Sequence, residues 1–271
     1  MRQVESMGVS SLWVVTMFHF LPALAMLPLI LSVPNASRED WMRASIAGLL
    51  VGAGFVFYAL GLIVSSVTKT VVLFYMTPIW STIFAYFVIN ERVGLARWFA
   101  IFGGISGCAL VMDLNSQSMH FNQADLLGLF SGVFWALGSV TVRRFNKINF
   151  LHVTFLQYLL GGVMAFGAVL YIGNPTPTVD AFLRAAPIAF FTSALIFLPT
   201  ALLVFRIMQY VSPGLVGILM LSEALVAALS AAIWLGETLS LPQWLGVVTI
   251  LTTGVLIGFH EGKIKVTKQA D

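Results

Sequence analysis

The feature that most constrains this chain is a succession of apolar runs, each about twenty residues long and almost without charge. Such a run, coiled into an α-helix that rises about 1.5 Å per residue, crosses the ~30 Å hydrocarbon core of a bilayer. In chain order the runs lie at residues 9–32, 44–66, 70–89, 96–112, 126–142, 150–172, 186–206, 214–235 and 242–259. They predict an all-α integral membrane protein with nine transmembrane helices.

Composition indicates that lipid, not water, is the main solvent of this chain. Hydrophobic residues are 59% and charged residues 9% of the 271 residues, whereas soluble domains are about half apolar and a quarter charged. The longest clearly polar linkers, 113–125 and 173–180, are too short for a separate soluble domain. The first run is too long for the apolar region of a signal peptide, so we interpret it as a span. Cys108 is the sole cysteine, which excludes an intrachain disulfide.

The basic residues that give the net charge of +3 are scattered among short loops. Membrane topology therefore explains this charge better than nucleic-acid binding does. Lysine and arginine concentrate on the cytoplasmic side of membrane proteins. When alternate loops are assigned to opposite sides, three of the fourteen basic residues fall on one side, Arg2, Lys69 and Arg184, and eleven on the other, Arg38, Arg43, Arg92, Arg97, Arg143, Arg144, Lys147, Arg206, Lys263, Lys265 and Lys268. The C-terminus is therefore predicted in the cytoplasm, and the protein in the inner (plasma) membrane.

Two segments of the chain repeat at a fixed distance. Glu91 and Glu237 are 146 positions apart, and so are Trp98 and Trp244, and Ser66 and Ser212. The segments 64–98 and 210–244 align at this distance without a gap. A tandem repeat whose unit has an odd number of helices is inverted across the membrane, as in many secondary transporters.

The repeated segment "PIWSTIFAYFVINE" (78–91), followed by a helix with Trp98, resembles the EamA-like branch of the drug/metabolite transporter superfamily. "FWALGSVTVRR" (134–144) is similar to the helix that opens the second unit in that family, and "MFHFLPALAMLPLIL" (17–31) to the second helix of the first unit. The resemblance implies ten helices in two inverted five-helix repeats. Ala224 departs from it, because the match with Pro78 would predict a proline there.

Against this ten-helix pattern, the first EamA-like repeat (1–112) has four helices and lacks the first, and the second repeat (126–260) has five. A linker (113–125) joins them, and a cytoplasmic tail (261–271) follows. Either the chain lacks an N-terminal helix that its relatives carry, or the protein has an odd number of spans. The repeat favours the first interpretation.

Glu223 is the one acidic residue that falls deep within a run, about halfway along 214–235. An ionised carboxylate at that depth costs about 2.5–3.5 kcal/mol on insertion scales, so it normally faces the bundle interior or a wet cavity. Two interpretations stay open: a protonated side chain hydrogen-bonded between helices, or a site for a proton or a cationic solute.

The remaining candidates are weighed against structural roles. His19 and Gln157 lie within spans, where a hydrogen bond between helices competes with a role in a relay or solute pathway. The resemblance implies a pathway bordered by Tyr75, Pro78, Trp80 and Trp135, although aromatic residues in membrane proteins mostly face lipid. Glu91 and Glu237 end their helices at the aqueous edge, as anchors or as gate residues.

The resemblance implies a secondary transporter that moves a small metabolite, amino acid-like or otherwise amphipathic, outward by alternating access. Rival interpretations are a truncated, non-transporting protein of the same fold and an intramembrane enzyme. The second is disfavoured because GxxxxGK[ST] and HExxH motifs are absent from the sequence. The expected partners are a small-molecule solute, the lipid bilayer, protons as coupling ion and a second copy in a homodimer. No nucleic acid, cofactor or metal is expected.

Overall fold

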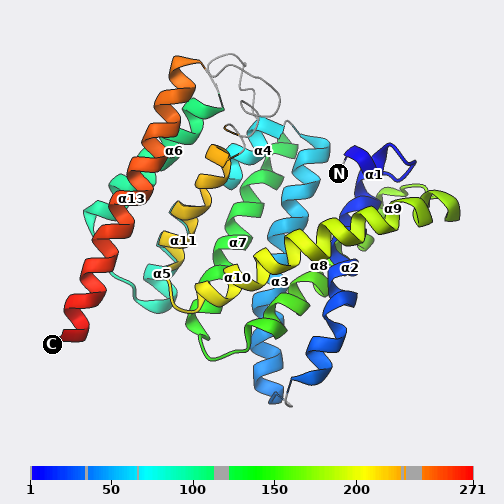
Figure 1. The fold of residues 1–271 in the computed structure, drawn as a ribbon, viewed down its shortest axis with the longest axis horizontal. Coiled ribbons are helices and arrows are strands. Elements are labelled where there is room, and N and C mark those ends of the chain that lie inside the picture. Colours follow the sequence, from blue (N-terminus) through cyan, green and yellow to red (C-terminus); the bar gives the residue numbers. More distant parts are fainter. Residues whose placement is uncertain are drawn as a thin grey trace.

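The computed structural model describes residues 2–33, 36–65, 67–112, 122–226, 229 and 240–270, and in these residues all regular structure is helical (Figure 1). The elements in chain order are α1 Arg2–Glu5, α2 Ser11–Ser32, α3 Arg38–Val64, α4 Val67–Phe74, α5 Thr77–Ile89, α6 Leu95–Val111, the 3₁₀ turn η2 Gln123–Asp125, α7 Leu126–Arg144, α8 Phe150–Ile172, α9 Val179–Thr192, the π-helical η3 Ser193–Phe197, α10 Leu198–Met208, α11 Pro213–Met220 and α13 Leu241–Ala270.

The structure is that of a multi-pass membrane protein. Within the described residues, seven helical segments are long and apolar enough to cross a bilayer: Ser11–Ser32, Arg38–Val64, Lys69–Ile89, Gln123–Arg144, Phe150–Ile172, Val179–Met208 and Leu241–His260. Two shorter apolar helices, Leu95–Val111 and Pro213–Val226, cover the other two predicted runs as far as these are described. Each predicted run thus overlaps helical structure as far as it is described, and in the described residues Leu95–Val111 and Pro213–Val226 are shorter than a typical span.

The α3 helix begins six residues before the run that predicted it. The Ser37 side chain accepts a hydrogen bond from the Asp40 backbone N at 3.1 Å and so caps the helix. Acidic residues in the first turn, Glu39 and Asp40, favour the positive end of the helix dipole. Thr178 caps α9 in the same way, before the run 186–206 begins. Caps, and not only apolar length, therefore set these boundaries.

Small residues allow several helices to pack at close range. The α3 helix packs along both α7 and α8; a Cβ on Gly48 would lie 2.8 Å from the Gln157 backbone N, and one on Gly52 would lie 2.8 Å from the Gln157 carbonyl oxygen. The α6 and α13 helices are paired just as closely, since a Cβ on Gly246 would lie 2.5 Å from the Gly107 carbonyl oxygen. Close approach of this kind replaces the hydrophobic driving force that is missing in lipid.

The bundle has two distinguishable ends (Figure 1). The N-terminus, α4 and the start of α7 lie at one end, and the C-terminus, the end of α5 and the connection from α10 to α11 lie at the other. At that second end α13 continues as helix to Ala270, so the segment predicted as a tail (261–271) is, as far as it is described, an extension of the last helix.

Candidate functional site

Two helical segments are interrupted at matching positions. A turn at Tyr75 and Met76 divides the predicted run 70–89 into α4 and α5, and a turn at Leu221 ends α11 before helix resumes at 222–226. Val67 and Pro213, which begin α4 and α11, are 146 positions apart, and so are Phe74 and Met220, which end them. The interruption therefore occupies the same place in both copies of the repeated sequence.

Pro78 explains the first interruption. Proline lacks a backbone N–H, and its ring collides with the carbonyl group four residues earlier, which here belongs to Phe74. The α4 helix ends at Phe74, and the Phe74 carbonyl oxygen instead accepts a hydrogen bond from the Thr77 hydroxyl. Pro78 then occupies the first turn of α5, where its missing N–H costs nothing. At the matching place in the second copy Ala224 stands instead, and nothing in the sequence marks the turn at Leu221.

The two interruptions lie close to one another and to α7. A Cβ on Gly217 of α11 would lie 2.9 Å from the Pro78 Cα, so the two helices cross in near-backbone contact just beside their breaks. On the α7 side, a Cβ on Gly132 would lie 3.0 Å from the Phe74 carbonyl oxygen. Non-helical backbone at membrane depth is tolerated where protein buries it or where it lines a cavity.

Three aromatic side chains and one carboxylate lie together at these breaks. The rings of Tyr58 and Phe74 lie 4.9 Å apart, and those of Phe74 and Tyr75 lie 5.9 Å apart. The Glu223 carboxylate lies within electrostatic range of the hydroxyl groups of both tyrosines. Tyr75 is buried, Tyr58 is half-buried and Glu223 is exposed. Thr77 occupies the position in the first copy that matches Glu223.

Trp135 and Trp80, both predicted to border the pathway, lie near the same place with different surroundings. Trp135 is fully buried and belongs to the core cluster that also contains Phe74, Tyr75 and Leu221. Trp80, one turn into α5, stacks against Phe84 at 6.4 Å between ring centroids. Its indole N–H is buried and makes no hydrogen bond in the structure, so it is a donor without an acceptor.

His19 and Gln157 lie apart from the breaks, where α2 and α8 pack together. The His19 Nδ1 donates to the Val15 carbonyl oxygen at 2.8 Å, within its own helix, and its ring meets Tyr158 edge-on at 6.2 Å. The Nδ1 hydrogen bond of His19 is thus within its helix and not between helices. Gln157 is buried, and its Oε1 makes no hydrogen bond in the structure.

Glu91 lies at the C-terminal end of α5, where Asn90 adopts a left-handed conformation with φ of 52°. Its carboxylate forms an ion pair with Arg97 of α6, with 2.7 Å between Oε1 and Nη1. Glu237, the matching residue of the second copy, lies outside the described residues.

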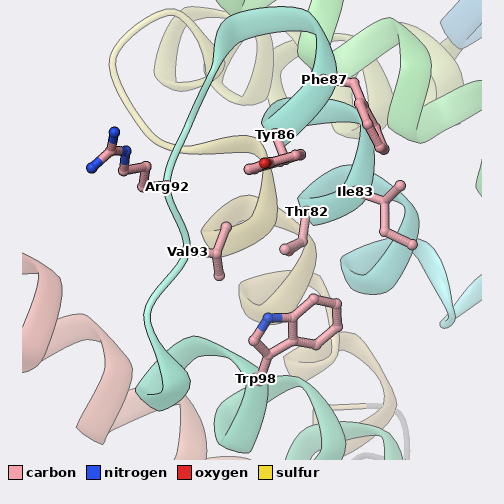
Figure 2. A pocket seen from close by; sticks show the side chains of 7 residues that line it. All are labelled: Thr82, Ile83, Tyr86, Phe87, Arg92, Val93 and Trp98. Atoms are coloured by element: carbon pink, nitrogen blue, oxygen red, sulfur yellow. The ribbon is translucent and has the colours of Figure 1, made fainter.

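A pocket of about 600 Å³ opens at this same end of α5 and is distinct from the helix breaks. It is lined by Thr82, Ile83, Tyr86, Phe87, Arg92, Val93 and Trp98. Figure 2 shows Thr82, Val93 and Trp98 around a common space, with Arg92 pointing away from it. None of the residues predicted as site residues lines this pocket.

Sequence reasoning missed two residues, Tyr58 beside the helix breaks and Asp125 at the start of α7. Gly54, Tyr58 and Gly61 occupy positions i, i+4 and i+7 and therefore lie on one face of α3. The two glycines on that face were the sequence feature that could have indicated that Tyr58 faces other helices. Asp125 was read as part of a polar linker, yet it is fully buried. Its carboxylate accepts hydrogen bonds from the Ser65 hydroxyl and, at 2.8 Å, from the Asn122 backbone N.

Comparisons with known proteins agree on the kind of protein. The EamA-like transporter family matches residues 1–113 and 122–259. A solved crystal structure shares the fold over 92% of this chain and 87% of its own, with a TM-score of 0.72 and 16% identity.

Three curated relatives are named as transporters. The uncharacterized transporter YoaV of Bacillus subtilis is 24% identical over 48% of this chain and 46% of its own length. A riboflavin transporter of Vibrio cholerae is 30% identical over 35% and 30%, and an S-adenosylmethionine uptake transporter of Rickettsia bellii is 25% identical over 45% and 41%. The chain matches each over less than half of that relative's length. Because the family match covers nearly the whole sequence, the chain belongs to the EamA-like transporter family.

Proposed function

We propose that this protein is a secondary transporter that moves a small amphipathic metabolite outward across the inner membrane by alternating access. The observation that carries the proposal is the matched interruption of α4–α5 and α11, which meet at Pro78 and Gly217. Paired broken helices at corresponding places of two repeats are how many transporters build a site near the bilayer midplane. In this proposal the two repeats are inverted and the C-terminus lies in the cytoplasm.

In this mechanism the α7 helix stays in place while α4 and α11 move relative to it. At its start, the Asp125 carboxylate binds Ser65 and Lys69, which flank the beginning of α4. At its end, Arg143 donates to the Gln209 carbonyl oxygen, just before α11. We infer that α4 closes the outer side and α11 the inner side, and that each opens when its polar contacts to α7 break.

Glu223 is the coupling residue in this mechanism. A carboxylate beside the helix breaks binds a proton in one state of the cycle and releases it in the other, which links solute movement to the proton gradient. Glu91 has a different role, because its ion pair with Arg97 fixes the α5–α6 loop.

Uptake into liposomes with an imposed proton gradient tests the proposal. Radiolabelled riboflavin and S-adenosylmethionine are suitable probes, since relatives are named for them. Gradient-dependent accumulation of either one, abolished by a protonophore, supports a secondary transporter. Chemical conversion of a probe without a gradient would indicate an enzyme instead. If neither these nor a broad panel of metabolites crosses, the protein is a membrane component without transport.

A further inference from the structure

We propose that the solute carries a positive charge, and that the Glu223 carboxylate and the rings of Tyr58, Phe74 and Tyr75 bind this charge together. The inference rests on the proposed transport function, because it assigns the chemical class of solute to the same site. It goes beyond a small metabolite to an amine, ammonium or sulfonium compound with an apolar or aromatic body.

The arrangement of the rings provides the first argument. Three aromatic side chains from α3, from α4 and from the turn after α4 follow one another at 4.9 and 5.9 Å between centroids. The tyrosines lie within electrostatic range of Glu223 and of one another. The negative face of an aromatic ring attracts a cation within about 6 Å of its centroid. An apolar ligand body can pack on the same surface, so charge and bulk are recognised together.

The charge balance provides the second argument. Within the part of the chain that the structure describes, no salt bridge joins Glu223 to a basic side chain. An ionised carboxylate at the centre of a span is costly, so it is either protonated or paired. A cationic solute supplies the partner that the described residues do not, and a proton takes its place when the site is empty.

The surroundings argue against an anionic solute. Lys69 and Arg97, which flank the first break in sequence, are paired with Asp125 and Glu91 at opposite ends of the bundle, and Arg92 lies at the pocket beyond the end of α5. The dipoles of the half-helices add little net preference, because α4 and α11 end at the breaks while α5 and the helix 222–226 begin there. The full charge of Glu223 therefore decides the sign of the solute.

Thermal stabilisation of the purified protein in detergent tests the inference, since a ligand that binds the folded state raises the melting temperature. Two matched pairs of probes differ in charge: tyramine against the uncharged tyrosol, and S-adenosylmethionine against S-adenosylhomocysteine, which lacks the sulfonium charge. In each pair, we expect the member with the additional positive charge to stabilise the protein at about tenfold lower concentration than its partner. The difference should vanish in Glu223→Gln.

Variants of Tyr75 distinguish the contribution of its aromatic ring to binding from that of its hydroxyl group. Tyr75→Phe keeps the aromatic face and should change the apparent affinity for tyramine less than about threefold, whereas Tyr75→Leu should weaken it about tenfold. Tyr171→Leu is the control, because Tyr171 is 93% exposed at the end of α8. If Glu223→Gln fails to fold, the same comparison can be made with the unaltered protein. A hydrophobic carbodiimide modifies Glu223, mass spectrometry measures the modification, and the two members of each probe pair are compared for how well they protect the carboxylate.

The results distinguish the two proposals. Equal stabilisation by both members of each pair, or a charge preference that survives in Glu223→Gln, would overturn the cation inference. Gradient-driven riboflavin uptake that tyramine and S-adenosylmethionine do not inhibit would overturn it as well, and would leave transport standing. A charge preference that depends on Glu223, in a protein through which no solute moves, would support the cation site and count against transport.

Discussion

Lys69 and Asp125 form a salt bridge between the start of α4 and the start of α7, with 3.4 Å between the Lys69 Nζ and the Asp125 Oδ2. The carboxylate is fully buried and also accepts hydrogen bonds from Ser65 and from the Asn122 backbone. Because α4 leads directly to the turn at Tyr75, this contact controls how the first interrupted helix sits in the bundle.

We expect Asp125→Asn to lower the free energy of unfolding by about 3 kcal/mol, since it removes the charge of a buried carboxylate that Lys69, Ser65 and the Asn122 backbone bind together. The melting temperature in detergent measures this. Asp180→Asn is the control, because Asp180 is 76% exposed in its pair with Arg184 and surface pairs contribute little. Equal effects of the two substitutions would show that the buried contact does not stabilise the fold.

Cys108 offers a native reporter for the proposed gates. It is the only cysteine, it is buried, and its Sγ lies 3.9 Å from the Leu221 carbonyl oxygen at the second break. In Asp125→Asn, a membrane-impermeant maleimide added outside should label Cys108 at least about threefold faster than in the unaltered protein. In Arg143→Ala the increase should appear only for reagent added inside, and labelling that rises equally from both sides would argue against separate gates.

Two glycines of α13 give a matched test of helix packing. A Cβ on Gly246 would come within 2.5 Å of the Gly107 carbonyl oxygen and 2.8 Å of the Val111 backbone N, so Gly246→Ala should cost about 1–3 kcal/mol. Gly254 has no such neighbour within 4 Å, and Gly254→Ala should be neutral or slightly stabilising because alanine favours the helix. Thermal unfolding of both variants decides this, and a tolerated Gly246→Ala would contradict the close packing of α6 and α13.

The predicted topology can be tested with reporter fusions. Alkaline phosphatase fused after Lys268 should be inactive and green fluorescent protein at the same site fluorescent, because the lysine and arginine bias places this end in the cytoplasm. Fusions after Pro175, between α8 and α9, should behave in the opposite way. A phosphatase active after Lys268 would reverse the assignment of every loop.

We expect Glu223→Gln to fold and to lose proton-driven accumulation by at least about tenfold, while exchange of solute for solute continues. The amide keeps the shape of the side chain but cannot bind and release a proton. Glu91→Gln, which weakens only the pair with Arg97, should keep most of the accumulation. Measurement is by liposome uptake with purified variants, and accumulation by Glu223→Gln at the normal level would remove this carboxylate from the coupling mechanism.

The positions of the spans could be predicted from the sequence because the length of an apolar run is set by the thickness of the bilayer. The repeat distance of 146 also predicted where corresponding features lie, since the turns at Tyr75 and Leu221 obey it. Of these turns, only the first has a cause visible in the sequence, namely Pro78. The GxxxG spacing, which is typical of close helix contacts in membranes, occurs at Gly48 and Gly52 and at Gly254 and Gly258. A Cβ would meet another helix at the first pair, whereas the second pair has no neighbouring atoms within 4 Å of a Cβ.

Features that depend on distant partners could not be predicted. Asp125 is buried by Ser65 and Lys69, which lie 60 and 56 positions earlier, and no local pattern shows such a contact. The depth of Glu223 in its run was visible, but the aromatic group beside it comes from α3 and from the α4–α5 turn, and only the fold brings these together. A hydrogen bond between helices was one of two interpretations of His19, and the bond that its Nδ1 makes stays within α2 because the carbonyl group four residues earlier is in reach.

The presence of Thr77 at the place that matches Glu223 means that the two helix breaks share a single carboxylate. If one monovalent cation replaces one proton on that group, the site carries the same net charge in both directions of the cycle. One-for-one exchange then moves no net charge, so the membrane voltage, worth about 2.3 kcal/mol per elementary charge at 100 mV, neither drives nor opposes it. A potassium diffusion potential should therefore leave the rate unchanged, and the pH difference across the membrane alone should set how far the solute is concentrated.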